Sequence, residues 1–328
     1  PVYHIFSAVF YLLTGQAKLV SLFAGIASLA VFYYLARRFY PESTPYSFIL
    51  LVFLPFHAYM SGMGYVTILL FFFGVLGFWL YLRYLESGET SYLAFTCVSC
   101  SAAALTHYHG FLLCLIIASD LVFRNPRKAL IVLASVIVLS SPWYLRNLQE
   151  FGNPVWPLFF EGKYSHPKTS GGYSASGALN FFSFDTYKSV FFDFWIGAPN
   201  SGEDFMDNVQ TGRQRFPIVF EAGMLLWLAV ILASSILAVK GFQGYFGEKN
   251  RLPLLALLFS MLPIPFLANA RMIVFCVPFI VIAVGRRLHE FKESWRLAFL
   301  ALAVLSFTGV TTAYAYTYHE IFNDYPGF

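Results

Sequence analysis

The sequence predicts an all-α, polytopic transmembrane protein with about ten or eleven membrane segments and one long extracytoplasmic loop. Of its 328 residues, 58% are hydrophobic and only 12% are charged, and the mean hydropathy is +0.65. A soluble domain carries roughly 25% charged residues, so this chain has too few to cover a water-facing surface. In addition, apolar runs close to the length that crosses about 30 Å of hydrocarbon recur along the chain.

The predicted membrane segments form two groups on either side of a long polar region. Long apolar stretches are found at 19–37, 47–60, 65–84, 91–106, 109–123, 128–143, 219–240, 252–269, 272–288 and 296–316. A shorter stretch at 2–13 falls below the length that a full crossing needs. We therefore expect three parts: an N-terminal transmembrane module at 1–143, an extracytoplasmic loop at 144–217 and C-terminal transmembrane helices at 218–328.

The Lys and Arg residues predict the orientation. If Arg37 and Arg38 are cytoplasmic, alternation of the segments places most other basic residues on the same side: Arg83, Arg124, Arg127, Lys128, Lys240, Lys249, Arg251, Arg286, Arg287, Lys292 and Arg296. The short loops of the opposite side hold only Lys18, Arg146 and Arg271. This asymmetry follows the positive-inside rule for a plasma-membrane protein and places the long loop outside.

The long loop is not an idle connection, because most connections have about 4–6 residues. Its stretch NFFSFDTYKSVFFDFWIG, at 180–197, repeats aromatic residues at three- and four-residue spacings with charged residues between them. That pattern is typical of an amphipathic helix in the membrane interface. The acidic residues Glu203, Asp204 and Asp207 are interpreted as solvated; the alternative is a site for a hard cation such as Mg²⁺ or Mn²⁺.

The passage SPWYLRNLQEFGNPVWPLF, at 141–159, joins the last predicted helix of the first group to this loop. Pro142 is compatible with a helix end, Trp143 and Tyr144 suit the membrane interface, and FGNP predicts a turn. Aromatic and basic residues that anchor the helix at the membrane interface, followed by residues that end the helix, would explain the composition of the passage. The alternative is that these residues have a function beyond anchoring.

This passage and four others together resemble the GT-C fold glycosyltransferases, which are polytopic enzymes that use lipid-phosphate-linked sugars. PWYLRN followed by FGNPVWPL is similar to a "PWY-x-RN … GNP-x-(Y/W)-P" passage of that family. The other passages are PVYHIFSAVFYLLTG, LVSLFAGIASLAVFYYLARRFYP, ALTHYHGFLL and ANARMIVFCVPFIVIAVGRRL. They occur in the family's order from Pro1 to Leu288.

The resemblance implies transfer of a sugar from a polyprenyl-phosphate donor to a glycan, lipid or protein acceptor on the outer face. In that family the catalytic carboxylate lies in the first outer loop, before the helix that resembles 1–15. We therefore expect the catalytic base upstream of Pro1, in a natural N-terminus that this sequence lacks. The family often has a second acidic residue where this sequence reads Gly64-Tyr65-Val66-Thr67, so the chain departs from the family's metal-binding pattern there.

A lipid-phosphate donor needs cations at the outer ends of helices, and two arginines suit that role. Arg271 precedes a long apolar helix, and an ionisable residue at membrane depth is costly unless it serves a function. Arginine also matches phosphate through paired donors. Arg271 and Arg146 are therefore predicted to bind the donor; the alternative for each is an anchor that reaches the interface.

His107 and His109, in the sequence T-H-Y-H-G, are also predicted to contact phosphate or sugar. A polar helix cap is the alternative, and a metal pair is disfavoured because the two residues lie closer than the usual i, i+4 spacing. His4 and His57 are predicted to be core histidines. The Cys97-x-x-Cys100 pair lies in an apolar helix, so we interpret it as packing rather than as a redox or metal site.

Two other functions remain open from the residues alone. A transporter or flippase of a lipid-linked substrate would share the apolar helices and isolated arginines, but it predicts an internal repeat, which we do not see. A surface-polysaccharide polymerase or ligase would also have a large outer loop. No nucleotide-binding glycine motif is present, which fits a lipid-linked donor better than an ATP-driven transporter.

Overall fold

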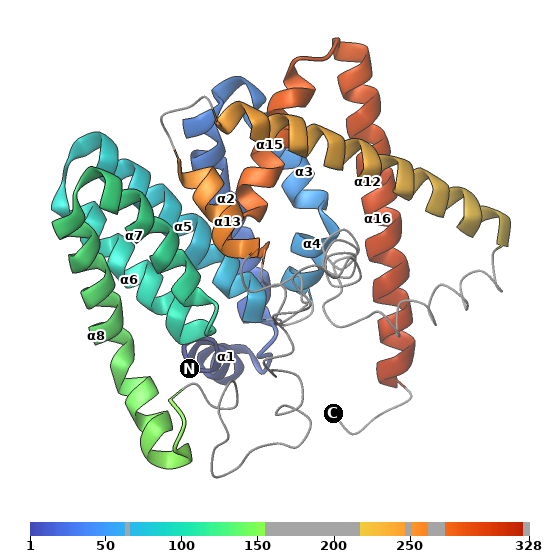
Figure 1. Cartoon of the computed structure of the whole chain (residues 1–328). Coiled ribbons are helices and arrows are strands. Elements are labelled where there is room, and N and C mark those ends of the chain that lie inside the picture. Colours follow the sequence, from blue (N-terminus) through green and yellow to red (C-terminus); the bar gives the residue numbers. More distant parts are fainter. Residues whose placement is uncertain (63–65, 155–216, 247–250, 262–272, 324–328) are drawn as a thin grey trace, which may run out of the picture.

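The computed structural model of the chain describes residues 1–62, 66–154, 217–246, 251–261 and 273–323 (Figure 1). Every regular element in these ranges is a helix, which confirms the all-α prediction. The α-helices are α1 (Val2–Thr14), α2 (Leu19–Phe39), α3 (Thr44–Phe53), α4 (Pro55–Gly62), α5 (Val66–Ser87), α6 (Thr90–Thr106), α7 (Gly110–Arg124), α8 (Pro126–Phe151), α12 (Pro217–Tyr245), α13 (Leu252–Met261), α15 (Val277–His289) and α16 (Glu293–Asn323). A short 3₁₀ helix, η1 (Pro41–Ser43), precedes α3.

Two predicted segments are interrupted in the structure. The stretch at 47–60 is divided between α3 and α4, because Leu54 has an extended backbone with ψ 121° and Pro55 follows it. Proline disfavours the helical conformation of the residue before it, so the break lies where the sequence requires it. The stretch predicted from residue 272 becomes α15 only at Val277, after a turn.

The helix predicted at 128–143 does not end at Pro142, because α8 continues to Phe151. Proline at position 142 cannot donate to the carbonyl of Val138. The hydroxyl of Ser141 donates to that same carbonyl at 2.9 Å, which replaces the missing hydrogen bond. The helix ends instead at Gly152, whose φ of 70° requires a residue that tolerates the left-handed region. Residues 144–151 of the predicted loop are therefore helical.

The helices form an integral membrane bundle. Among the described residues, α2, α5, α8 and the part Leu225–Tyr245 of α12 are long and apolar enough to cross a bilayer. Helices α1, α6 and α13 are shorter apolar helices; α6, for example, has 17 residues. The full number of crossings stays a prediction.

The bundle has two groups of helices that meet along α2 and α5 (Figure 1). The chain first forms an antiparallel series in which α5 packs on α2 and α6, and α7 packs on α6 and α8. The second group consists of α3, α12, α15 and α16, with α15 packed between α3 and α12. Helix α13, which follows α12 in the chain, packs on α7 and so connects the second group to the first.

Small residues set the close approaches in the second group. A Cβ atom added to Gly241 of α12 would lie 2.5 Å from the carbonyl oxygen of Ala283 in α15. One added to Gly285 would lie 2.0 Å from the hydroxyl of Ser47 in α3. Because helices in lipid associate mainly through such close packing, α15 is held between its neighbours by its own and their small side chains.

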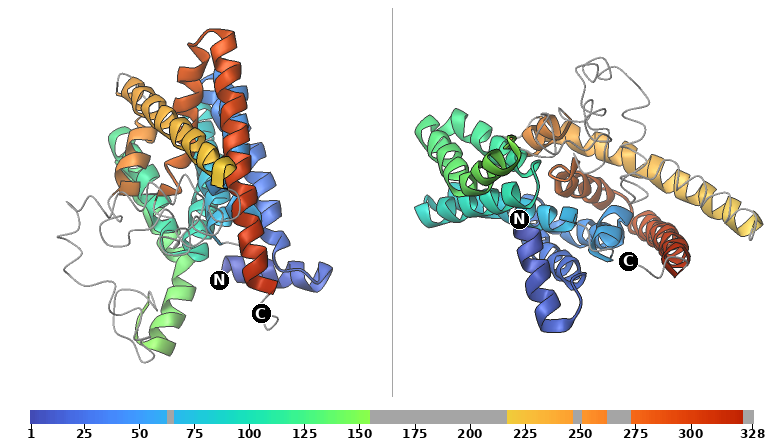
Figure 2. Two further views of the ribbon diagram at one scale, coloured as in Figure 1. Left: turned by 90° about the vertical axis from the view of Figure 1, so that its right-hand side faces the viewer. Right: turned by 90° about the horizontal axis from the view of Figure 1, so that it is seen from below.

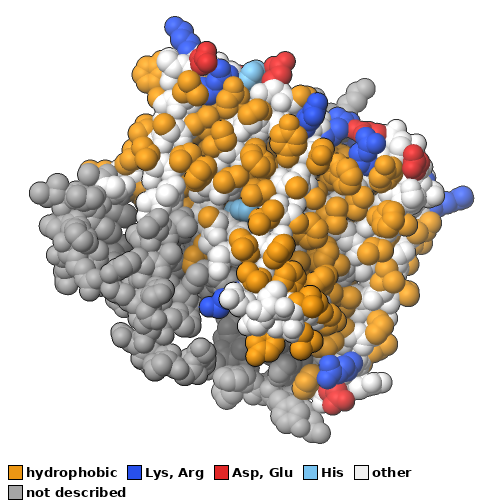
Figure 3. Space-filling model, turned by 180° about the vertical axis from the view of Figure 1, so that it is seen from behind, with side chains coloured by type: hydrophobic (Ala, Val, Ile, Leu, Met, Phe, Trp, Pro, Cys, Tyr) orange, Lys and Arg blue, Asp and Glu red, His pale blue; other side chains and the backbone are white. Residues whose placement is uncertain are grey.

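Charged side chains lie at the rims of the bundle, and a broad apolar surface lies between them (Figure 3). We name the two ends by their residues. The basic end contains the C-termini of α2, α5, α7 and α15, whereas the α1 end contains α1 and the turn between α6 and α7. Of the described Lys and Arg residues, only Lys18 and Arg146 lie at the α1 end.

Helix α1 lies across the end of the bundle instead of along it (Figure 2). None of its residues is buried, and Leu12 and Leu13 are 81% and 78% exposed. Such an exposed apolar helix suits the membrane interface. The prediction of a core position for His4 is wrong, because this residue lies on the exposed side of α1. The prediction for His57 is confirmed: it is buried and lies 3.0 Å from the hydroxyl of Ser28.

A buried carboxylate joins α5 to α7 near the basic end. Asp120 is 1% exposed, and its Oδ2 accepts from the hydroxyl of Tyr81 at 2.5 Å and from Nε of Arg124 at 2.7 Å. A buried charge is tolerated only when it is paired and hydrogen-bonded in this way. Helices α5 and α7 are therefore fixed to each other by polar contacts within an otherwise apolar interface.

We expect Asp120→Asn to lower the free energy of unfolding by about 2 kcal/mol and Tyr81→Phe to lower it by about 1 kcal/mol, since hydrogen bonds to charged groups are the stronger ones. Glu86→Gln is the matched control, because Glu86 pairs with the exposed residues Arg38 and Arg83. The free energy of unfolding of the three variants is measured in detergent micelles. Equal effects of Asp120→Asn and Glu86→Gln would show that the buried contacts contribute no more to the free energy of unfolding than an exposed ion pair does.

Candidate substrate-binding site

The predicted histidines lie in the three-residue turn between α6 and α7, at the α1 end. Helix α6 ends at Thr106, His107 has an extended backbone with φ −155°, and α7 begins at Gly110. The amide of Gly110 donates to the carbonyl of His107 at 2.8 Å and closes the turn. A Cβ atom on Gly110 would lie 2.0 Å from the backbone of Ala103, so glycine is needed for this tight crossing.

The turn brings the two histidine rings together. The ring centroids of His107 and His109 lie 4.4 Å apart, and the amide of His109 donates to Nδ1 of His107 at 3.4 Å. Both residues are half-buried, but the two ring nitrogens of His109 are themselves shielded from solvent. An imidazole N–H group such as that of His107 can donate to the oxygen atoms of a phosphate or a sugar.

Tyr144 of α8 packs against this turn. Its hydroxyl donates to the carbonyl of Ala104 at 2.8 Å, and its ring centroid lies 6.1 Å from that of Tyr108 and 5.3 Å from that of Phe111. The continuation of α8 beyond Pro142 makes this contact possible. The passages PWYLRN and THYHG, which lie far apart in the sequence, therefore meet in one place.

Tyr108 adds a second kind of donor to the cluster. Burial raises the pKa of Tyr108 to about 12, because the charged phenolate would lose its hydration. The hydroxyl therefore keeps its proton at neutral pH and can donate it in a hydrogen bond. Sequence reasoning missed Tyr108 and the contact role of Tyr144, because aromatic residues at a helix end are equally typical of a membrane-interface belt.

The structure places Arg146 apart from the histidines. Arg146 is exposed, and its guanidinium lies 5.3 Å from the ring centroid of Trp143. It follows Tyr144 by two residues, which is about 200° around the helix axis, so it faces away from the side of α8 that packs on the turn. Arg271 lies outside the described residues, as do the interfacial helix predicted at 180–197 and the loop acids.

The chain turns back directly after α8. Asn147 is 2% exposed, and its side-chain amide donates to the carbonyl of Pro154 at 3.3 Å. This contact fixes the path of the chain through the FGNP turn that the sequence predicts. Asn147 is a positioning residue that sequence reasoning did not identify, since nothing in its spacing distinguishes it from a solvated asparagine.

The described residues contain no group of three or more His, Cys, Asp or Glu side chains that could hold a metal ion. The cysteines Cys97, Cys100, Cys114 and Cys276 are all free and buried, as the packing interpretation expects. A metal site of that kind would need residues beyond the described ones, such as the loop acids. We derive no chemical step from one.

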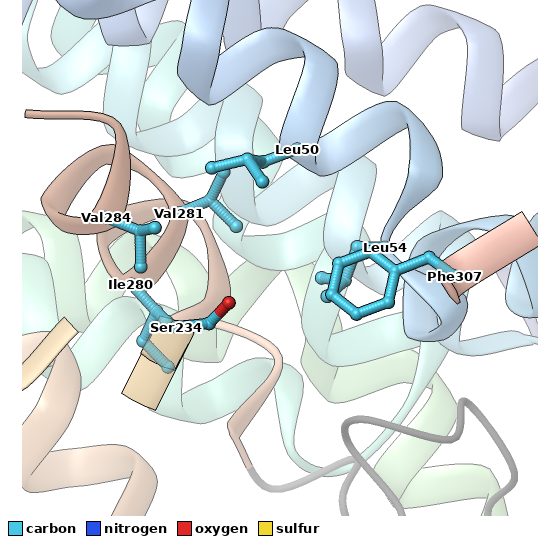
Figure 4. A pocket seen from close by; sticks show the side chains of 7 residues that line it. All are labelled: Leu50, Leu54, Ser234, Ile280, Val281, Val284 and Phe307. Carbon is cyan, nitrogen blue, oxygen red and sulfur yellow. The ribbon is translucent and has the colours of Figure 1, made fainter. Parts of the chain in front are cut away.

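An apolar pocket lies between α3, α12, α15 and α16, away from the histidines (Figure 4). It is lined by Leu50, Leu54, Ser234, Ile280, Val281, Val284 and Phe307. Among these residues only Ser234 has a polar side chain, and none is charged. This pocket does not have the groups that would bind a phosphate.

The arrangement defines a class: an integral membrane protein whose polar and aromatic donors gather at one end of an apolar helical bundle. Among solved structures, it is similar to ArnT from Cupriavidus metallidurans bound to undecaprenyl phosphate, with a TM-score of 0.57 and 15% identity over 89% of this chain and 50% of that one. It is also similar to the archaeal oligosaccharyltransferase AglB from Archaeoglobus fulgidus, in complex with an inhibitory peptide and a dolichol-phosphate, with a TM-score of 0.51 and 14% identity over 95% of this chain and 46% of that one.

The chain therefore has the GT-C fold of these two proteins, as the sequence resemblance predicts, and spans about half the length of each. No family model matches the sequence, and no curated protein matches it.

Proposed function

We propose that this chain is part of a membrane glycosyltransferase that moves a sugar from a polyprenyl-phosphate carrier to an acceptor on the outer membrane face. The meeting of the THYHG turn with the PWYLRN helix carries the proposal, since the two passages were singled out separately in the sequence. Glycans, lipids and proteins are the acceptor classes that this chemistry allows.

The chemistry of the cluster suits a donor phosphate. The ring N–H group of His107 and the neutral hydroxyl of Tyr108 would donate to the phosphate oxygens, and Arg271 would supply charge. Such donors stabilise the negative charge that develops on the leaving phosphate as the bond to the anomeric carbon breaks. The acceptor hydroxyl or amine attacks that carbon, forms the new glycosidic bond and loses its proton to a base. The proposal assigns that base to no described residue, and a divalent cation, if used, would be held by loop acids such as Asp204 and Asp207.

We expect the double variant His107→Ala/His109→Ala to bind undecaprenyl phosphate roughly fivefold more weakly, through the loss of about 1 kcal/mol of hydrogen bonding. His4→Ala is a matched control, because His4 is an exposed histidine at the same end of the bundle. Binding is measured by titration of the lipid into protein in detergent, with thermal unfolding of each variant to check the fold. Wild-type affinity of the folded double variant would exclude these histidines from the site.

The orientation of the proposal rests on the basic residues, which lie almost entirely at the end opposite to the histidines. We expect residues 160–215 to be outside the plasma membrane. Ser174→Cys and Ser201→Cys should react with an impermeant thiol reagent in intact cells, whereas Lys292→Cys at the basic end should react only after lysis. The native cysteines are buried and give a low background. The reverse labelling pattern would contradict this orientation.

A further inference from the structure

We propose that the turn between α7 and α8 at the basic end binds the headgroup of an anionic phospholipid. Four basic side chains gather there from three helices or their flanks: Arg124, Arg127, Lys128 and Arg251. The guanidinium of Arg251 lies 4.7 Å from the ring centroid of Phe123, which brings the start of α13 to the end of α7. We call these four residues the basic corner. This site is separate from the proposed donor site at the α1 end.

The basic corner has few acidic partners. At other places on the basic end, exposed carboxylates pair with several of the cations: Glu86 with Arg38 and Arg83, Glu290 with Arg287, and Glu42 with His289. Within the described part of the chain, Arg127, Lys128 and Arg251 form no ion pair, and the one carboxylate in contact with the corner is the buried Asp120, which pairs with Arg124. The corner thus keeps positive charge that a bound anion would balance.

The helix termini at the corner point to the same ligand. Arg127 and Lys128 lie in the first turn of α8, which contains no acidic residue. The N-terminus of a helix carries partial positive charge, so two cations there are unfavourable in the absence of an anion. The side chain of Asn125 caps the amide of Lys128 at 3.2 Å, and the amide of Ala129 donates to the carbonyl of Asn125 at 3.1 Å. Because Pro126 has no N–H group, the amide of Arg127 is the first-turn donor that remains for an anion.

The apolar surface beside the corner favours a lipid over a soluble anion. Phe123 is 67% exposed directly beside Arg124, and Leu130 is 67% exposed one turn into α8. An acyl chain of a lipid could contact these side chains while its phosphate contacts Arg127 and Arg251. Aromatic and basic residues together at a helix end are typical of the level of the lipid headgroups.

The test compares short-chain lipids that are soluble as monomers. Wild-type protein in a neutral detergent is titrated with dihexanoyl-phosphatidylglycerol, dihexanoyl-phosphatidylcholine and inorganic phosphate, and binding is followed by native mass spectrometry. We expect phosphatidylglycerol to bind most tightly. In Arg127→Gln/Arg251→Gln its affinity should fall roughly 30-fold, because each basic residue near an anionic lipid contributes about a fivefold effect.

Two further variants decide whether the corner itself is responsible. Arg127→Lys/Arg251→Lys keeps the charge and should retain most of the affinity. Arg37→Gln/Lys292→Gln removes the same charge from exposed positions elsewhere at the basic end and should bind like wild type. An equal loss in this control would overturn the site in favour of diffuse attraction. Equal binding of phosphatidylcholine, or equally tight binding of inorganic phosphate, would overturn the assignment to an anionic lipid.

Discussion

Replacement of Arg271 by alanine is expected to weaken binding of a polyprenyl-phosphate sugar donor by roughly 10- to 150-fold. This range corresponds to the loss of one charge-assisted contact to phosphate, about 1.5–3 kcal/mol. Arg271→Lys keeps the charge but loses the paired-donor geometry, so we expect it to be impaired as well. An arginine that only anchored a helix at the interface would tolerate lysine almost fully.

The residues that follow Arg271 distinguish these two roles. Ile273, Val274, Phe275 and Cys276 are all at most 4% exposed. Phe275 packs so closely on α5 that a Cβ atom on Gly74 would lie 2.7 Å from its ring. The chain after Arg271 is thus buried in protein instead of facing lipid, where an anchoring arginine would be expected.

The measurement is donor affinity, together with the transfer rate where the complete enzyme is assayed. Arg146→Ala is the matched comparison, because Arg146 is exposed and stacks on Trp143; a purely anchoring role would make the two alanine variants equally mild. Thermal unfolding in detergent establishes that each variant is folded. Wild-type donor binding by folded Arg271→Lys and Arg271→Ala would identify Arg271 as an anchor.

The helices of this fold follow closely from the sequence, because each apolar run must satisfy its own backbone hydrogen bonds in lipid. The predicted stretches 65–84, 91–106 and 109–123 correspond to α5, α6 and α7 with shifts of a few residues. The exceptions arise from side-chain chemistry. A helix passes through Pro142 because the hydroxyl of Ser141 donates to the carbonyl of Val138, which the proline leaves without its usual donor. This compensation cannot be predicted from the proline alone.

The candidate site was predicted less completely. The T-H-Y-H-G pattern identified His107 and His109, but the packing of Tyr144 on their turn depends on how α6, α7 and α8 cross, which no local pattern specifies. Arg146 looked equivalent to the histidines in sequence, yet its position on α8 turns it away from them. The roles of all four predicted site residues therefore stay predictions that the variants above test.

Gly110→Ala is expected to lower the free energy of unfolding by about 3 kcal/mol and to weaken donor binding with it. An added Cβ atom would meet the carbonyl oxygen of Ala103 at 2.1 Å and the amide nitrogen of Ala104 at 2.3 Å. Both are backbone atoms of α6, so no rotation of a side chain relieves the contact. Helix α7 must instead move away from α6, which is the costly form of overpacking.

The same movement would separate the histidine turn from Tyr144, whose hydroxyl donates to Ala104 beside the clash. Gly110→Val should therefore be worse than Gly110→Ala in both stability and binding. Gly223→Ala is the control, because this helical glycine has open space where a Cβ would lie and should gain up to about 1 kcal/mol from helix propensity. Thermal unfolding in detergent and undecaprenyl phosphate titration supply the two readouts. If Gly110→Ala unfolds and binds like Gly223→Ala, the tight crossing of α6 and α7 does not hold the turn in place, and the histidine cluster loses its structural basis as a binding site.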